Sequence, residues 1–278
     1  MVLDPRLNAW RKDIADIDLA DRLFAPHYAE ALTRACGIIP AMVRSEPSDE
    51  AEAVSQLLPG EEFAVLDISG GWAWGYCRLD HRVGYVEAIE LAAPLETTHI
   101  VIEAQAPVQA GSDPLSAALS FLPMGSRLHG NVQGAVLEFE GGFIPLSYLR
   151  PIAEPEADPV TVAQRLMGTL YLRGGRSLHG IDCSGLVQLS MRMTGRSVPR
   201  DTDMQASGLG EPIDPGADMA GLIRGDLVFW KGHVAIMLDE KNIIHANGHT
   251  MTVSREKLSA AVERIAYLYG GPTGFRRP

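Results

Sequence analysis

The stretch Gly-Ile-Asp-Cys-Ser-Gly-Leu-Val at residues 180–187 decides the fold of the second half of the chain. Cys183 lies where a glycine-rich turn ends and an apolar run begins, and this run stops at Thr194-Gly195. The pattern predicts a helix whose first turn contains the cysteine. Backbone N–H groups and the helix dipole favour a thiolate at such a position, so we expect Cys183 to be a nucleophile.

Composition excludes several classes of partner and site. The 278 residues include 24 basic and 35 acidic side chains, and the net charge of −11 comes without any cluster of Lys and Arg. We therefore expect neither nucleic acid nor a membrane surface as a partner. Cys36, Cys77 and Cys183 lack metal-binding spacing, so no metal and no cofactor is expected. The first two are interpreted as small buried hydrophobic residues.

The N-terminal region shows no targeting signal in its pattern. Residues 1–8 and the charged segment that follows contain no apolar core of a secretory signal, and no run reaches the length of a membrane span. A cytoplasmic protein is therefore expected. Apolar residues in 18–25 and 28–36 recur largely every three to four positions, which predicts a helical arm over residues 1–36.

Short strand-like segments separated by turn residues follow the expected arm. They predict two small all-β barrels, over residues 37–95 and 96–153. A Pro-Gly turn at 59–60 and a Met-Gly turn at 124–125 occupy matching places, which indicates a tandem repeat. An acidic, proline-rich linker then leads into a domain over 154–278, where a helix before several strands indicates an α+β unit.

Two histidines in this last domain are candidates for the base that a nucleophilic cysteine needs. His233 opens one apolar strand and His245 lies in the next. A three-residue loop at 239–241 would pair Ala235 with His245 and place both imidazoles on one face of the sheet. A two- or four-residue loop would put His245 on the opposite face. Each histidine taken alone is more often a structural residue.

Four motifs in a fixed order resemble the NlpC/P60 cysteine peptidases. They are Asp-Cys-Ser-Gly at 182–185, Gly-Asp-Leu-Val-Phe at 225–229, His-Val-Ala-Ile at 233–236 and Ile-His-Ala at 244–246. The resemblance covers about residues 155–278. It implies a papain-like core and cleavage of peptidoglycan stem peptides at a γ-D-glutamyl bond.

The resemblance also implies roles for individual residues. Cys183 is expected to be the nucleophile, His233 the general base and acid, and His245 the residue that orients His233. The backbone N–H of Cys183 and the hydroxyl of Tyr171 are expected to donate to the oxyanion. Arg173 departs from the pattern, because family members often carry an aromatic residue at this place.

Each β module resembles a bacterial SH3 (SH3b) domain, in its LxxG turn and its closing Gly-aromatic-Val/Ile segment. The whole layout is similar to the γ-D-glutamyl-L-diamino acid endopeptidases of cell-wall recycling (dipeptidyl-peptidase VI type), in which the first SH3b module admits only a free N-terminal L-Ala. This resemblance implies a murein peptide, L-Ala-γ-D-Glu-diamino acid, as substrate. The residues expected to bind it are Asp182, Ser184, Arg200, Asp201, Glu61 and Tyr85.

Several alternatives remain open from the sequence. Asp182 is either a substrate ligand or only a helix cap, a role that Ser184 could also fill. The protein is either a recycling enzyme, an exported hydrolase anchored to the wall by its SH3b modules, or an inactive wall-binding module. The preferred diamino acid and the oligomeric state have no signal in the sequence.

Overall fold

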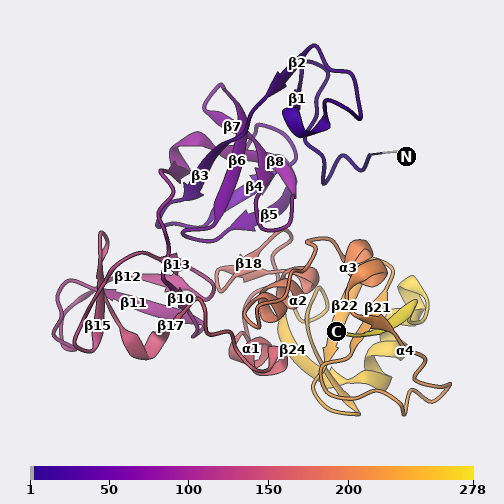
Figure 1. Cartoon of the computed structure of the whole chain (residues 1–278). Helices are drawn as coiled ribbons and strands as arrows, with labels where there is room; N and C mark the ends of the chain where they lie inside the picture. Colours follow the sequence, from indigo (N-terminus) through magenta and orange to yellow (C-terminus); the bar gives the residue numbers. More distant parts are fainter. Residues whose placement is uncertain (1–2) are drawn as a thin grey trace. The chain divides into compact units, whose positions relative to one another are not determined.

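A computed structural model describes residues 3–278, which form two compact units. The first ends at Glu154 and the second spans Pro155–Pro278 (Figure 1). The first unit is built almost entirely of strands, whereas the second combines four helices with a six-stranded sheet. Within residues 3–278, no helix combines the length and the apolar character that a membrane crossing requires.

The first module of the N-terminal unit is a seven-stranded antiparallel sheet in the order β5-β4-β8-β7-β6-β3-β9. Its elements are β3 (Leu32–Cys36), β4 (Ala41–Arg44), β5 (Ala53–Leu57), β6 (Glu62–Ser69), β7 (Trp72–Cys77), β8 (Val83–Glu87), η2 (Ala88–Glu90) and β9 (Leu91–Ala92). Its core contains the fully buried Val43, Phe63 and Val86 together with Cys36 and Cys77. Both cysteines are buried and free, as expected from the sequence.

The predicted helical arm over residues 1–36 is wrong. Short strands β1 (Ile14–Asp16) and β2 (His27–Ala29) pair in parallel, and only a 3-10 turn, η1 (Ile17–Leu19), lies between them. The following residues form β3, which pairs with β6 and buries Ala35 and Cys36 in the core of the module. These long-range strand contacts outweigh the local helical spacing of apolar residues, which is only a weak determinant on its own.

The second module, which ends at Pro151, contains a three-stranded and a five-stranded sheet. Its elements are β10 (His99–Val101), β11 (Gln105–Gln109), β12 (Ala118–Pro123), β13 (Arg127–Leu128), β14 (Asn131–Gln133), β15 (Val136–Phe139), β16 (Gly142–Pro145), η3 (Leu146–Tyr148) and β17 (Leu149–Pro151). Val108, Leu122 and Ile144 are the centre of a separate apolar core.

The two modules use the same scheme of strand pairing. The β4–β5 hairpin corresponds to β11–β12, and the β7–β8 pair corresponds to β15–β16. In each module a 3-10 helix precedes a closing strand that returns to the first strand, as β9 to β3 and β17 to β10. Gly60 and Gly125, in the turns that match in sequence, both have a positive φ, of 76° and 86°.

The C-terminal unit is an α+β fold around a sheet in the order β20-β25-β21-β22-β23-β24. Its helices are α1 (Pro159–Arg165), α2 (Cys183–Arg192), α3 (Thr202–Gly208) and α4 (Leu258–Tyr269). Its strands are β18 (Arg176–Ser177), β19 (Gly180–Ile181), β20 (Glu211–Pro212), β21 (Leu227–Trp230), β22 (His233–Met237), β23 (Asn242–Asn247), β24 (Thr252–Lys257) and β25 (Gly274–Arg277).

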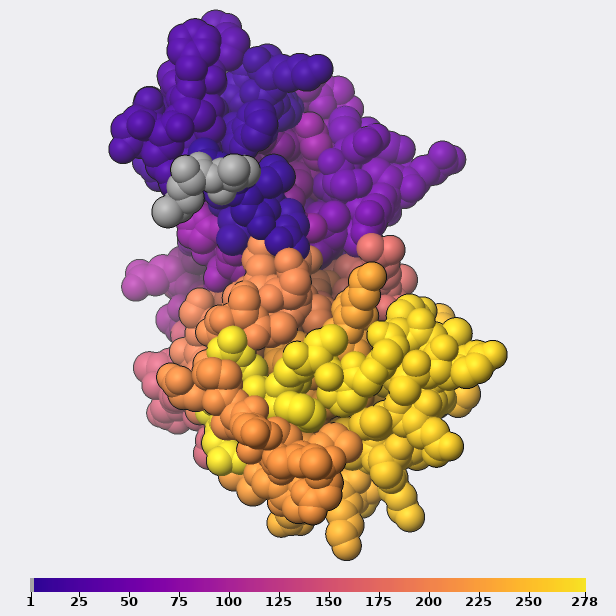
Figure 2. All heavy atoms as spheres, turned by 90° about the vertical axis from the view of Figure 1, so that its right-hand side faces the viewer, coloured from indigo at the N-terminus to yellow at the C-terminus, as the bar shows by residue number. Residues whose placement is uncertain are grey.

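Helix α4 packs its apolar side on the sheet. Leu258, Ala261 and Ile265 of the helix share one buried cluster with Ala235 of β22 and Ile243 of β23. The other side of α4 is exposed, and the C-terminal segments, yellow in Figure 2, form much of this unit's surface in that view. The arrangement fixes α4 against the two strands that contain His233 and His245.

A substitution at Gly75 of β7 tests how tightly the strands of the first module are packed. A Cβ at this position would lie 1.8 Å from the carbonyl oxygen of Ala64 on β6. We expect Gly75→Ala to lower the free energy of unfolding by about 1–3 kcal/mol, because the strands must separate to admit the methyl group. Urea unfolding followed by circular dichroism measures the loss. Gly271→Ala, where a Cβ meets no atom within 4 Å, is the control and should leave stability nearly unchanged.

Candidate active site

Cys183 is the first residue of α2, as the sequence predicts. Asp182 is the N-cap, and its Oδ1 accepts a hydrogen bond of 2.7 Å from the backbone N–H of Gly185. Of the two possible caps, the structure therefore uses Asp182. The cysteine itself is 6% exposed, so the thiol lies in a largely enclosed environment at the helix start.

Asp182 and Arg200 form a buried ion pair that holds this helix start in place. Arg200 donates to both carboxylate oxygens of Asp182, at 3.0 and 2.6 Å, and to the hydroxyl of Ser184 at 2.8 Å. Asp182 also accepts from the backbone N–H of Gly174 at 2.7 Å. Burial favours the neutral acid, but the charge of Arg200 and these hydrogen bonds outweigh it and lower the pKa of Asp182.

The surroundings of Cys183 disfavour the ionised thiolate, whereas its position at a helix start favours it. Burial and then the negative charge of Asp182 raise the pKa of Cys183 to about 11, although hydrogen bonds from the Val234 N–H and the Thr202 side chain lower it in part. Desolvation of the anion and the charge of Asp182 thus act against the stabilisation that a helix start gives a thiolate. Where the thiol is still protonated, its proton must leave as the nucleophile attacks.

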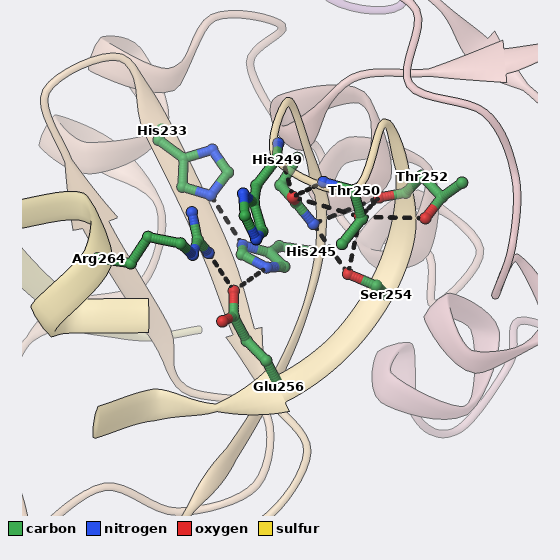
Figure 3. Close-up of polar contacts among 9 residues, drawn as sticks. His233, His245, His249, Thr250, Thr252, Ser254, Glu256 and Arg264 are labelled. Atoms are coloured by element: carbon green, nitrogen blue, oxygen red, sulfur yellow. Dashed lines mark hydrogen bonds and ion pairs between the residues drawn. The ribbon is translucent and has the colours of Figure 1, made fainter. Parts of the chain in front are cut away.

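The predicted histidine pair is present, with the predicted strand register. Met237 pairs with Ile243, and the Leu238 N–H donates to the Asn242 carbonyl, so the hairpin loop has three residues. Nε2 of His233 lies 2.9 Å from Nδ1 of His245 (Figure 3). The imidazoles are therefore coupled directly, as the sequence argument required.

His233 is neutral in this arrangement and has one ring nitrogen available. Burial, then the charges of His245 and Arg264, lower its pKa to about 3. Because Nε2 is engaged by His245, Nδ1 is the atom that can accept a proton. The backbone N–H of Val234, the next residue along β22, lowers the pKa of Cys183 in part, which places the thiol near the start of this strand.

Tyr171 lies close enough to Cys183 for the two groups to interact electrostatically when the thiol is ionised. Burial, followed by the charges of Cys183 and Asp182, raises the pKa of Tyr171 to about 12. Its hydroxyl therefore stays protonated near neutral pH and can donate a hydrogen bond. The backbone of Tyr171 is fixed by an isolated bridge to Ile181, just before the helix start. Its role as oxyanion donor remains a prediction.

The other predicted substrate ligands fall into two groups. The first group, Asp182, Ser184 and Arg200, is buried together. The carboxylate of Asp182 already accepts hydrogen bonds from other groups of this chain. Glu61 and Tyr85 belong to the N-terminal unit. Glu61 is buried and accepts from the Leu58 N–H.

Asp201 is the N-cap residue of α3, next to Arg200 along the chain. Tyr85 lies on β8, opposite Trp74 of β7. Binding of the substrate by any of these residues stays a prediction.

Three polar residues of the site have no distinctive motif in the sequence. Thr202 contacts the thiol from the start of α3, whereas Glu256 of β24 and Arg264 of α4 lie behind the histidine pair. The segment Thr-Val-Ser-Arg-Glu-Lys that contains Glu256 has a single apolar residue and resembles an ordinary exposed, polar segment. To find Glu256 from the sequence, the argument that pairs the strands of His233 and His245 would have had to be extended to the next strand.

A thiol at a helix start, beside a strand that supplies one imidazole of a coupled pair, defines a cysteine peptidase of papain-like type. Residues 168–270 match the model of the NlpC/P60 family, and residues 43–91 match the bacterial dipeptidyl-peptidase Sh3 domain. The chain thus carries an NlpC/P60 cysteine peptidase domain preceded by a bacterial SH3 domain.

Two curated relatives and one solved structure are similar to this chain over most of its length. Dipeptidyl-peptidase 6 of Lysinibacillus sphaericus is 26% identical over 82% of this chain and 97% of its own length. The gamma-D-glutamyl-L-lysine dipeptidyl-peptidase of Bacillus subtilis is 29% identical over 69% of this chain and 71% of its own. The crystal structure of an NlpC/P60 family protein from Bacillus cereus has the same fold, with a TM-score of 0.73 at 18% identity over 88% of this chain and 99% of that one.

The buried ion pair at the helix start should contribute far more to stability than an exposed one. Arg200→Met leaves Asp182 charged and buried, and we expect a loss of about 3–5 kcal/mol in the free energy of unfolding. Arg224→Met removes the exposed pair with Asp158, whose side chains are 43% and 37% exposed, and should cost at most about 1 kcal/mol. Thermal and urea unfolding of both variants measure the difference; equal losses would contradict it.

The raised pKa of Cys183 predicts how its alkylation depends on pH. The rate of modification by iodoacetamide should increase steeply from neutral pH towards pH 11, since the thiolate fraction grows as pH approaches the pKa. Mass spectrometry of the Cys183 peptide, with a Cys183→Ala blank, measures the rate. A rate that is already maximal between pH 5 and 8 would mean that a thiolate–imidazolium pair exists in the free site.

Proposed function

We propose that this protein is a cysteine endopeptidase that cleaves the bond between γ-D-Glu and a diamino acid in murein stem peptides. The observation that carries the proposal is the His233–His245 pair beside the Cys183 helix start, which provides a nucleophile, a base and an orienting group. The relatives named dipeptidyl-peptidase 6 and gamma-D-glutamyl-L-lysine dipeptidyl-peptidase support the substrate class.

The chemistry follows from the protonation states of the site. Sγ of Cys183 attacks the γ-carbonyl carbon while Nδ1 of His233 accepts the thiol proton. The oxyanion that forms accepts hydrogen bonds from the Cys183 N–H and the Tyr171 hydroxyl. Collapse of this intermediate breaks the C–N bond, and His233 returns the proton to the leaving amine.

Hydrolysis of the thioester completes the cycle. A water molecule attacks the acyl carbon while His233 accepts one of its protons. The C–S bond then breaks, the acid product leaves, and the thiolate recovers its proton from His233. The thiol and the imidazole thus return to the protonation states that they had before the attack.

We further propose that the second β module is a second SH3b domain and that the substrate has a free N-terminal L-Ala. The repeated pairing scheme and the matching positive φ of Gly60 and Gly125 support the first proposal. Asp182, Ser184, Arg200 and Asp201 of the C-terminal unit are the proposed ligands of the substrate.

We place this activity in cytoplasmic recycling of cell-wall peptides. A requirement for a free L-Ala amine fits small peptides that another hydrolase has already released from the glycan, rather than the intact wall. An exported hydrolase would instead cleave cross-linked sacculi. Immunoblots of fractionated cells separate the two locations, and a periplasmic or extracellular signal would overturn the cytoplasmic assignment.

Digestion of L-Ala-γ-D-Glu-meso-diaminopimelate tests the substrate. We expect mass spectrometry to detect L-Ala-γ-D-Glu and free diaminopimelate, with no cleavage after Cys183→Ala. The same peptide with N-acetylated alanine should be cleaved at least about 100-fold more slowly, because a buried site for an ammonium rejects the neutral amide. Equal cleavage of both peptides contradicts the free-amine requirement, and no cleavage of either contradicts the substrate class.

A further inference from the structure

Glu256 lies directly behind the histidine pair. Its Oε1 is 2.8 Å from Nε2 of His245, the ring nitrogen that does not face His233. Arg264 of α4 contacts the same carboxylate oxygen from the other side. Figure 3 shows the contacts as one continuous series from His233 through His245 and Glu256 to Arg264.

The strand register explains why these side chains meet. Ile243 of β23 pairs with Glu256 of β24, so Glu256 and His245, two residues along from Ile243, lie on the same face of the sheet. His233 and His245 are related in the same diagonal way across β22 and β23. The three polar side chains thus cross three neighbouring strands, and α4 covers that face.

The contacts determine which nitrogen of each ring carries its proton. The carboxylate of Glu256 can only accept, so the ring nitrogen that faces it, Nε2 of His245, carries a proton; in the neutral ring Nδ1 is then the acceptor. Nδ1 of His245 then accepts from Nε2–H of His233 at 2.9 Å. This leaves the lone pair of His233 on Nδ1, the atom required to accept the Cys183 proton.

Charge reinforces this arrangement. Burial favours the neutral acid at Glu256, but the contacts with His245 and Arg264 outweigh it and lower its pKa, so the carboxylate is ionised at neutral pH. The side chain of His245 is fully buried and that of Glu256 is 23% exposed, so little water lies between the carboxylate and the imidazole to screen their interaction. The neighbouring Arg255 is exposed and lies 3.7 Å from Asp239, away from this series.

We propose that Glu256, held by Arg264, is a positioning residue for the proposed peptidase reaction: it fixes the tautomers of His245 and His233 and stabilises the imidazolium that forms on His233. The proposal rests on the proposed function only in its use of His233 as the base. The closing experiment therefore includes a measurement on the thiol that needs no peptide substrate.

The substitutions separate charge from hydrogen bonding. Glu256→Ala removes both, and we expect kcat to fall about 10–100-fold with KM nearly unchanged, as for outer groups that orient a histidine. Glu256→Gln keeps the shape but leaves Arg264 uncompensated, and Glu256→Gln with Arg264→Met removes both charges. The double variant should recover part of the lost kcat. Glu263→Gln, an exposed glutamate of α4, is the matched control and should behave as the wild type.

Alkylation of Cys183 distinguishes positioning from a purely structural role. At pH 7 the thiol reacts with help from His233, so the rate with iodoacetamide should fall about 10-fold or more in Glu256→Ala and Glu256→Gln. Above pH 10 hydroxide removes the proton directly, and the rates should match the wild type. Long-range 1H–15N spectra of 15N-histidine-labelled protein should show His245 losing its single Nε2–H tautomer.

Two results would overturn the proposal. One is wild-type kcat and wild-type alkylation at pH 7 in a folded Glu256→Gln protein. The other is an equal fall in alkylation at pH 7 and above pH 10, which indicates disruption of the thiol environment itself. Failure of the proposed peptidase function leaves the alkylation and tautomer measurements unaffected, so the two failures are distinguishable.

Discussion

The buried pair of Asp182 and Arg200 is the interaction on which the site depends. Asp182 ends the loop before α2, caps the helix and at the same time accepts hydrogen bonds from both terminal nitrogens of the Arg200 guanidinium. These contacts fix the direction of the first helical turn and therefore the position of the thiol. Burial, and after it the charge of the same carboxylate, raises the pKa of that thiol, so the group that positions the nucleophile also disfavours its ionised form.

The catalytic centre was predictable where local pattern and strand register decide the structure. A polar residue before an apolar run indicated the helix start at Cys183, and a three-residue loop indicated that His233 and His245 share a face. Glu256 was not predictable in the same way, because its contact depends on the register of a further hairpin and on the approach of α4. The raised pKa of Cys183 likewise depends on burial, which the sequence does not reveal.

The β modules show where the local spacing of apolar residues predicts the wrong secondary structure. Residues 28–36 have helical spacing of apolar side chains, yet β3 forms because its backbone pairs with β6 and its apolar residues fill the core of the module. The segments that follow were interpretable as strands, since glycine-containing turns separate them and alternation marks their buried side. The first module also begins earlier than residue 37, because a strand assigned to the arm belongs to its sheet.

The position of β24 has a consequence for how the site loses activity on warming. β24 is the outermost strand of its sheet and pairs along its whole length with β23. On its other side only the first residues, around Val253, are hydrogen-bonded to the backbone of Gly168 and Thr169, so the half that contains Glu256 pairs with β23 alone. An edge strand can detach locally at a free energy below that of global unfolding. Each local opening of β24 moves Glu256 away from His245, while Cys183 and His233 stay in place on interior elements. The fraction of competent enzyme is then set by the local opening of one strand, so heat inactivation should begin while the rest of the domain is still folded.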